Sequence, residues 1–142
     1  MIVYADSSFL VSNYVGDSHS AEADRRMSAQ PSILLTPLNR AELAHAISQY
    51  VFRRQITSID AQRIWAEFQT DCMQGLWVSA DLPAGIWDSS IELARKYGPT
   101  LGIRTLDSLH IACALELQAQ KFWTFDERQA RLAEAVGLDT SS

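Results

Sequence analysis

The sequence predicts an α/β fold in which a parallel sheet is covered by helices on both faces. Short apolar runs rich in β-branched and aromatic residues alternate with amphipathic segments of helical period, and apolar residues make up 47% of the 142 residues. Continuous apolar strands are typical of sheets buried on both faces, and strands separated by helices usually pair in parallel. The length suits a single domain spanning residues 1–142.

Strands and helices are expected to alternate along the whole chain. Four apolar runs are predicted to be strands, at residues 2–5, 33–35, 77–79 and 122–125. The pair Thr36–Pro37 supplies a capping hydroxyl and a proline at the first helical position, whereas Gly98–Pro99 predicts a helix end. Helices are predicted over residues 7–14, 20–29, 37–54, 58–75, 85–97, 105–120 and 126–137.

Charge and hydropathy exclude several classes of protein. The net charge of −5 argues against binding to nucleic acid by charge alone, although a bound cation would reverse the local sign of an acidic site. No apolar run reaches the roughly 18 residues of a membrane helix, and Asp6 interrupts the stretch that a secretion signal needs. We therefore expect a cytoplasmic protein without a membrane partner. Cys72 and Cys113 are expected to be buried free thiols.

Four acidic residues are expected at one edge of the sheet. Asp6 ends the first strand, Asp126 ends a later one, and Asp107 lies in the first turn of a helix. Glu42 lies about one turn into the helix that begins at Pro37, on a largely apolar stripe. Ligands of parallel α/β sheets bind beyond the carboxyl ends of the strands, so we expect these carboxylates to converge there.

Each acid also has a structural interpretation. Asp6 and Asp126 could be helix N-caps, Asp107 could complement a helix dipole, and Glu42 could pair with an arginine such as Arg40. Capping does not explain four like charges at one edge, since two charges 4 Å apart repel by roughly 4 kcal/mol at an effective dielectric constant of 20. Mg²⁺ and Mn²⁺ prefer carboxylate oxygens, so the cluster predicts a metal site that activates water against a phosphodiester.

Four segments occur in a fixed order along the chain: Tyr4–Leu10, Asn39–Leu43, Arg104–Ala112 and Thr124–Arg128. In order and spacing they resemble the PIN-domain nucleases, and most closely the VapC-type toxins of bacterial toxin–antitoxin pairs. The resemblance implies a three-layer α/β/α sandwich with a central parallel sheet. It also implies a single PIN-like nuclease domain, dependence on Mg²⁺ or Mn²⁺, homodimerisation, and a small antitoxin protein that reaches into the acidic cleft.

The resemblance assigns roles position by position. The metal-binding acids match Asp6, Glu42, Asp107 and Asp126. Thr124 matches the hydroxyl residue that supports the site two positions before the last acid, and Ser7 or Ser8 is expected to play a similar part.

Two further residues, one before and one after Asp107, are candidates for a role in the site. Arg104 precedes it by three positions and could hold a phosphate or pair with a surface acid. His110 follows it by three positions, on nearly the same helical face, and could contact RNA, orient a carboxylate or simply pack.

The leading hypothesis is a divalent-metal-dependent endoribonuclease that cleaves RNA as the toxin of a type II toxin–antitoxin pair. The alternatives are a PIN-type nuclease of RNA processing without an antitoxin, an aspartate-based phosphotransfer enzyme, and a non-catalytic protein-binding module. Aspartate-based phosphatases need a second aspartate two positions after the nucleophile, and Ser8 stands there after Asp6. The intact set of acids argues against a non-catalytic module.

Overall fold

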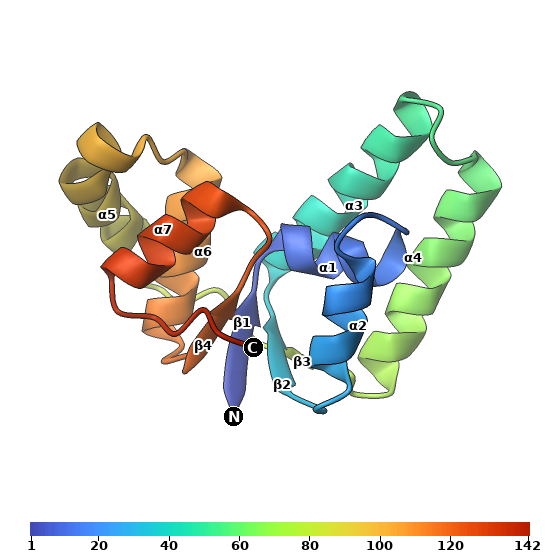
Figure 1. Cartoon of the computed structure of the whole chain (residues 1–142), viewed down its shortest axis with the longest axis horizontal. Coiled ribbons are helices and arrows are strands. Elements are labelled where there is room, and N and C mark those ends of the chain that lie inside the picture. The colour runs from blue at the N-terminus through green and yellow to red at the C-terminus, as the bar shows by residue number, and fades with distance from the viewer.

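A four-stranded sheet runs through the middle of the protein, between two groups of helices, in a computed structural model that describes residues 1–142 (Figure 1). Its strands are β1 (Ile2–Ala5), β2 (Ser32–Leu35), β3 (Trp77–Ser79) and β4 (Lys121–Trp123), in the spatial order β3-β2-β1-β4. Every pair of neighbouring strands is parallel. The predicted α/β/α sandwich with a central parallel sheet is confirmed.

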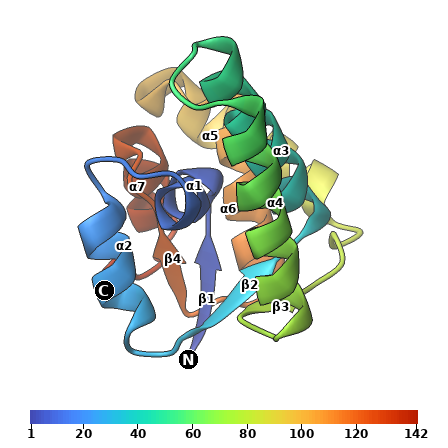
Figure 2. The ribbon, with the colours of Figure 1, turned by 90° about the vertical axis from the view of Figure 1, so that its right-hand side faces the viewer.

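Helices from the two halves of the chain cover opposite faces of the sheet. The first half supplies α1 (Ser7–Tyr14), α2 (Ser20–Met27), α3 (Pro37–Phe52) and α4 (Ser58–Met73), and the second supplies α5 (Ile86–Leu101), α6 (Thr105–Glu116) and α7 (Glu127–Ala135). The two groups lie to the right and the left of the sheet in Figure 1. In Figure 2 the arrow of β1 points toward α1, which begins beyond the carboxyl end of that strand.

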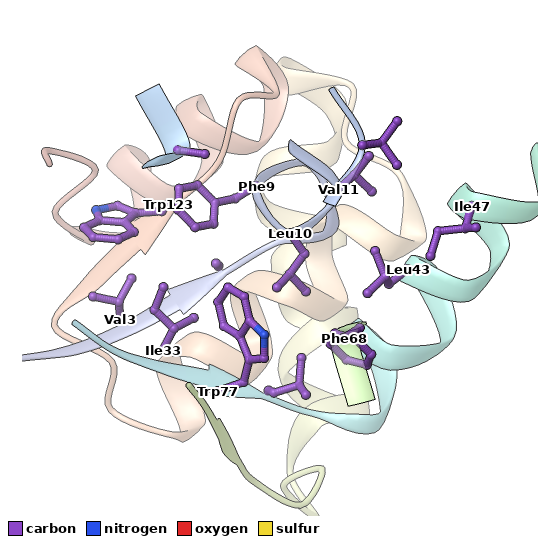
Figure 3. Packing of buried hydrophobic residues seen from close by; sticks show 14 residues of the cluster. Val3, Phe9, Leu10, Val11, Ile33, Leu43, Ile47, Phe68, Trp77 and Trp123 are labelled. Carbon is purple, nitrogen blue, oxygen red and sulfur yellow. The ribbon is translucent and has the colours of Figure 1, made fainter. Parts of the chain in front are cut away.

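The core consists of one apolar cluster on each face of the sheet. Successive residues of β1 face opposite layers, so Val3 and Ala5 pack toward α1–α4 while Tyr4 packs toward α5–α7. Figure 3 shows the first cluster, in which Phe9 of α1 lies beside Trp123 of β4. Burial on both faces explains why the strands have continuous rather than alternating apolar sequences.

Helix α5 continues through Gly98 and Pro99, so the predicted end at Tyr97 is wrong. Proline normally excludes the helical conformation from the preceding residue because its ring clashes with that residue's Cβ atom, and Gly98 has no Cβ. The helix instead ends at Gly102, whose φ of 64° is the left-handed conformation typical of a helix C-terminus.

Five other helices, α2, α3, α4, α6 and α7, end two to four positions earlier than predicted, and three of them are followed by a left-handed residue that is not glycine. Gln30 after α2, Arg54 after α3 and Gln118 after α6 all have positive φ angles, of 53°, 58° and 56°. A left-handed residue at this position usually is glycine, so these helix ends carried no recognisable signal.

Cys113 is buried, Cys72 is only half-buried, and both are free. No helix combines the length and the apolar character that a membrane-spanning segment requires.

Candidate active site

The four predicted acids line one cleft of about 390 Å³ at the carboxyl-end edge of the sheet. Asp6 directly follows β1, and Asp126 lies between β4 and α7. Glu42 lies in α3 and Asp107 in α6. The structure therefore brings together side chains that the sequence separates by as many as 120 positions (126 − 6).

Asp6 is the most buried of these acids, with only 4% of its surface exposed. Its Oδ1 accepts hydrogen bonds from the Ser8 hydroxyl at 2.5 Å and from the Phe9 backbone N–H at 3.3 Å, and its Oδ2 accepts one from the Thr124 hydroxyl. None of the ion pairs in the protein involves Asp6. Burial raises the pKa of Asp6, and these hydrogen bonds lower it only in part.

Two hydroxyl groups connect Asp6 to the loop that follows β4. The Thr124 hydroxyl donates to Asp6 and accepts the backbone N–H of Asp126 at 2.9 Å. The Ser8 hydroxyl donates to Asp6 and accepts the backbone N–H of Phe125 at 2.9 Å. Each hydroxyl therefore uses its donor on the acid and an acceptor site on the loop, which fixes the two parts of the site relative to each other.

Of the two serines expected to support the site, only Ser8 contacts an acid. Ser7 lines the cleft, but its hydroxyl makes no hydrogen bond to an acid. Thr124, the other hydroxyl residue expected to support the site, donates a hydrogen bond to Asp6.

Glu42 contacts His110, not an arginine. The Nε2 atom of His110 contacts the Glu42 carboxylate, and Nδ1 lies 2.7 Å from the hydroxyl of Tyr4 in β1. Tyr4 and His110 are both buried, and burial raises the pKa of Tyr4, which keeps its hydroxyl proton available for donation to Nδ1. The predicted alternative of an arginine partner for Glu42 is wrong, while orientation of a carboxylate was one of the roles expected of His110.

Asp107 and Asp126 each use one carboxylate oxygen to cap a helix. The Oδ2 atom of Asp107 accepts the backbone N–H of Arg104 at 2.9 Å, and the Oδ1 atom of Asp126 accepts that of Gln129 at 3.0 Å. The second oxygen of Asp107 and that of Asp126 remain without a hydrogen bond and are available to a ligand. The capping interpretation is correct for Asp126 and also for Asp6, which caps α1 by accepting a backbone N–H, and Asp107 is part of a capping box.

The set of donors suits a hydrated divalent cation. No three His, Cys, Asp or Glu side chains lie close enough together to form a complete metal cage. Mg²⁺ seldom needs such a cage, because it usually keeps several waters and binds through one or two carboxylates. Four carboxylates around one cleft, one of them buried without a cationic partner, fit this mode of binding.

Arg104 and Gln129 also line the cleft, and Asn39 contacts the residue before Asp6. Arg104 is exposed, lines the cleft and forms no ion pair, so the predicted alternative of pairing with a surface acid is wrong. Gln129 is 1% exposed, and neither its amide nitrogen nor its amide oxygen has a hydrogen-bond partner. Asn39 is buried and donates from its side-chain amide to the carbonyl oxygen of Ala5, directly before Asp6.

The sequence analysis did not identify Tyr4, Asn39 or Gln129. Gln129 shares the buried stripe of α7 with Leu132 and Ala133, and a polar residue on such a stripe is a recognisable signal. Asn39 gave a weaker signal, as the third helical residue after the Thr36 cap. Tyr4 gave none, because it lies inside an ordinary apolar strand.

Comparisons with known proteins identify the family of the chain and structures with a similar fold. The family model described as PIN domain matches residues 3–135. No curated protein sequence matches the chain. The fold is similar to that of Mycobacterium tuberculosis VapC20, described as a Sarcin-Ricin loop cleaving toxin, with 15% identity, 98% of each chain covered and a TM-score of 0.71.

Two further structures share the fold. FitAcB from Neisseria gonorrhoeae is 13% identical, covers 100% of this chain and 97% of its own, and has a TM-score of 0.73. A chain in a toxin-antitoxin complex from Klebsiella pneumoniae is 16% identical to this chain and has a TM-score of 0.58. The match covers 87% of this chain and 86% of that chain. The family model spans nearly the whole chain and includes all four acids, and the chain therefore belongs to the PIN domain family.

Proposed function

We propose that the chain is a divalent-metal-dependent endoribonuclease, the toxin of a type II toxin–antitoxin pair. The observation that carries this proposal is the convergence of four carboxylates from separate elements on one cleft, with Asp6 buried there without a cationic partner. Burying a carboxylate is unfavourable unless another group compensates its charge. A cleft that maintains this arrangement is suited to a cation.

The residues that would hold Mg²⁺ or Mn²⁺ are Asp6, Glu42, Asp107 and Asp126. When bound, such an ion lowers the pKa of water and stabilises charge on a phosphoryl oxygen. Ser8 and Thr124 keep Asp6 in one orientation.

Two other side chains prepare the cleft for a phosphodiester. His110 keeps Glu42 in place from the opposite layer of the site. Arg104 is the only arginine that lines the cleft, and its unpaired guanidinium is suited to hold a phosphate oxygen.

RNA is the substrate that the comparisons favour. VapC20 is described as a toxin that cleaves the Sarcin-Ricin loop, and this chain, a member of the PIN domain family, is similar to it in fold. The net charge of −5 means that RNA affinity cannot come from overall attraction to phosphates. We therefore expect RNA binding to require the metal, and to weaken strongly when the metal is removed.

An apolar groove between α3 and α4 suits a protein inhibitor. It has a volume of about 360 Å³, and its lining includes Ile47, Ala61 and Trp65. Helix α3 forms one wall of the groove and also carries Glu42, so a partner segment seated there would lie near the acidic cleft. We assign this groove to the antitoxin, which would bind through an apolar segment and extend toward the acids.

Helix α5 presents a surface suited to homodimerisation. Trp87 and Ile91 are 59% and 56% exposed, and they lie four positions apart on one face of this helix. Adjacent exposed apolar side chains of this size mark protein contacts. We propose that two copies meet through this face. Replacing Ile91 with Asp should convert a dimer into a monomer in analytical ultracentrifugation.

The phosphotransfer alternative lacks support in the geometry. Aspartate-based phosphatases need a second acid two positions after the nucleophile, and here Ser8 occupies that position and donates a hydrogen bond to Asp6.

The test is cleavage of single-stranded and stem–loop RNA with added Mn²⁺. Cleavage should disappear with a chelator and in Asp6→Asn, while the circular dichroism spectrum stays unchanged. Asp24→Asn is a matched control, because Asp24 is an exposed acid in α2 outside the cleft, and it should cleave normally. Full activity in the presence of a chelator would contradict the proposal.

A further inference from the structure

A second pocket adjoins the acidic cleft. Its volume is about 360 Å³, and it shares Ser7, Ser8 and Asp126 with the cleft. The side chains that distinguish it are His19, Tyr50 and Phe125 together with the carboxylate of Asp17. A ligand that reached from one pocket to the other would therefore contact both the acids and an aromatic surface.

The aromatic surface is a stack of rings that ends in an exposed histidine. The rings of His19 and Phe125 lie 4.5 Å apart between centroids, with an angle of 7° between their planes. Phe125 is half-buried and packs against the core. The centroid of its ring lies 5.6 Å from that of Phe9 and 5.8 Å from the Cζ atom of Arg26. His19 is exposed and forms the outermost layer, so its outer face is accessible to a planar ligand.

The loop before α2 holds His19 in this position. The Oδ1 atom of Asp17 accepts the backbone N–H of His19 at 2.8 Å, and its Oδ2 atom accepts the hydroxyl of Ser12 at 2.8 Å. Asp17 thereby ties the His19 backbone to α1. An aromatic ring that is already fixed in place loses less conformational entropy when a ligand stacks on it.

We propose that this pocket binds one RNA base close to the cleaved phosphodiester, with His19 as the stacking surface. The inference rests on the proposed ribonuclease function. The lining includes no lysine or arginine, and its carboxylates Asp17 and Asp126 would repel a phosphate. The same oxygens can accept hydrogen bonds from the exocyclic amino group of a base, and stacking on an aromatic ring is the usual way in which proteins hold an unpaired base.

Hydrogen bonds of Ser8 link the pocket to the acidic cleft. The Ser8 hydroxyl donates to Asp6 and accepts the backbone N–H of Phe125, so one side chain fixes the distance between the acid and the ring stack. A base stacked on His19 would therefore set the position of the neighbouring phosphate relative to the acids. His19 is a specificity-determining residue in this proposal, because it selects which phosphodiester enters the cleft.

The first test compares His19→Ala with His45→Ala on a short single-stranded RNA in the presence of Mn²⁺. His45 is the matched control, because it is also exposed but lies on α3 and outside the pocket. Stacking of a base on an aromatic ring contributes about 1–3 kcal/mol, so His19→Ala should lower kcat/KM by about 5- to 150-fold. His19→Trp should retain most of the activity, and His45→Ala should behave as the unmodified protein.

The same RNA with an abasic nucleotide at successive positions locates the base. At one position next to the cleavage site, the abasic substitution should lower kcat/KM as much as His19→Ala does. The two changes together should lower it no further than either change alone. If His19→Ala cleaves as well as the unmodified protein, or if the two losses are additive at every position, the inference is wrong while the ribonuclease function stands.

An experiment without cleavage separates the two proposals. Adenosine titrated into protein with ¹³C-labelled histidines should shift the ring signals of His19 and leave those of His45 unchanged. Such shifts in a protein that does not cleave RNA with Mn²⁺ would support the pocket and remove the proposed function. Cleavage of RNA by a protein whose His19 signals do not respond would overturn the pocket.

Discussion

His110 contacts Glu42 through its Nε2 atom, although 68 positions separate the two residues in the sequence. The other ring nitrogen lies against the hydroxyl of Tyr4, so the three side chains form a chain of hydrogen bonds that begins in the core and ends in the cleft. When a neutral His110 donates from Nε2 to the carboxylate, its Nδ1 accepts, and the buried tyrosine supplies that proton. The orientation of Glu42 thus depends on a residue of the central strand.

Replacing Tyr4 with Phe should disturb this chain without changing the shape of the core. The substitution leaves Nδ1 of His110 buried without a partner, which should lower the free energy of unfolding by about 1–3 kcal/mol in urea denaturation. Tyr97→Phe is the control, because the Tyr97 hydroxyl is exposed and its bond to the Ala135 carbonyl is long, at 3.4 Å. Equal losses in the two variants would show that the Tyr4 hydroxyl has no special role.

Asp6→Asn should make the metal-free protein more stable at neutral pH. Burial raises the pKa of Asp6, so the folded protein binds this proton more tightly than the unfolded chain. Stability contributed by the protonated form is therefore lost as the pH rises from the unfolded pKa, near 3.9, through the raised folded pKa. In denaturation curves recorded with a chelator, Asp6→Asn should not show this loss of stability with rising pH. Asp24→Asn should show the same loss as the unmodified protein.

With Mn²⁺ bound, the unmodified protein should be more stable than Asp6→Asn. A ligand that binds only the folded protein raises its melting temperature with concentration, and the unmodified protein has the carboxylate that Asp6→Asn lacks. Differential scanning fluorimetry over a range of Mn²⁺ concentrations measures this. An identical rise in melting temperature for both proteins would mean that Asp6 does not contribute to metal binding.

Gln129→Leu should stabilise the protein. Both polar atoms of the Gln129 amide are buried without partners, and replacing an unpaired polar group with an apolar one of similar size should raise the free energy of unfolding by about 1–3 kcal/mol. Gln49→Leu, an exposed position in α3, should change it by less than about 0.5 kcal/mol. A loss of stability in Gln129→Leu would reveal an ordered water bound to the amide.

Thr124→Val should remove the hydrogen bonds that connect Asp6 to the loop after β4. The side chains have similar shapes, but valine can neither donate to Asp6 nor accept the backbone N–H of Asp126. We expect a loss of about 1–3 kcal/mol in the free energy of unfolding and a large fall in RNA cleavage. Thr124→Ser keeps the hydroxyl and should restore both. If Thr124→Ser is as impaired as Thr124→Val, the methyl group matters more than the hydrogen bonds.

The convergence of the acids could be predicted because each one lies at or near the end of a recognisable element. Asp6 and Asp126 follow apolar runs, and the Thr36–Pro37 pair fixed the start of the helix that carries Glu42. Parallel strands place their carboxyl ends at the same edge, so the order of the elements was enough to group these residues.

The contacts within the site could not be predicted in the same way. The pairing of His110 with Tyr4 depends on how α6 packs against β1, which no local pattern encodes. The stack of His19 on Phe125 depends on the path of an irregular loop. Local patterns also missed the helix ends at Gln30, Arg54 and Gln118, where side chains adopt the conformation that glycine usually provides.

The hydrogen bond from Thr124 to Asp6 joins the residue after the last strand to the residue after the first strand, across 118 positions. During synthesis on the ribosome, Asp6 emerges 118 positions before its hydroxyl partner, and β1 emerges before the strand that pairs with it through Ala5 and Trp123. A nascent or prematurely terminated chain that stops before β4 cannot enclose the acid. The acidic centre is therefore assembled only after β4 has been synthesised, and until then Asp6 lacks both its hydroxyl partner and the strand that encloses it.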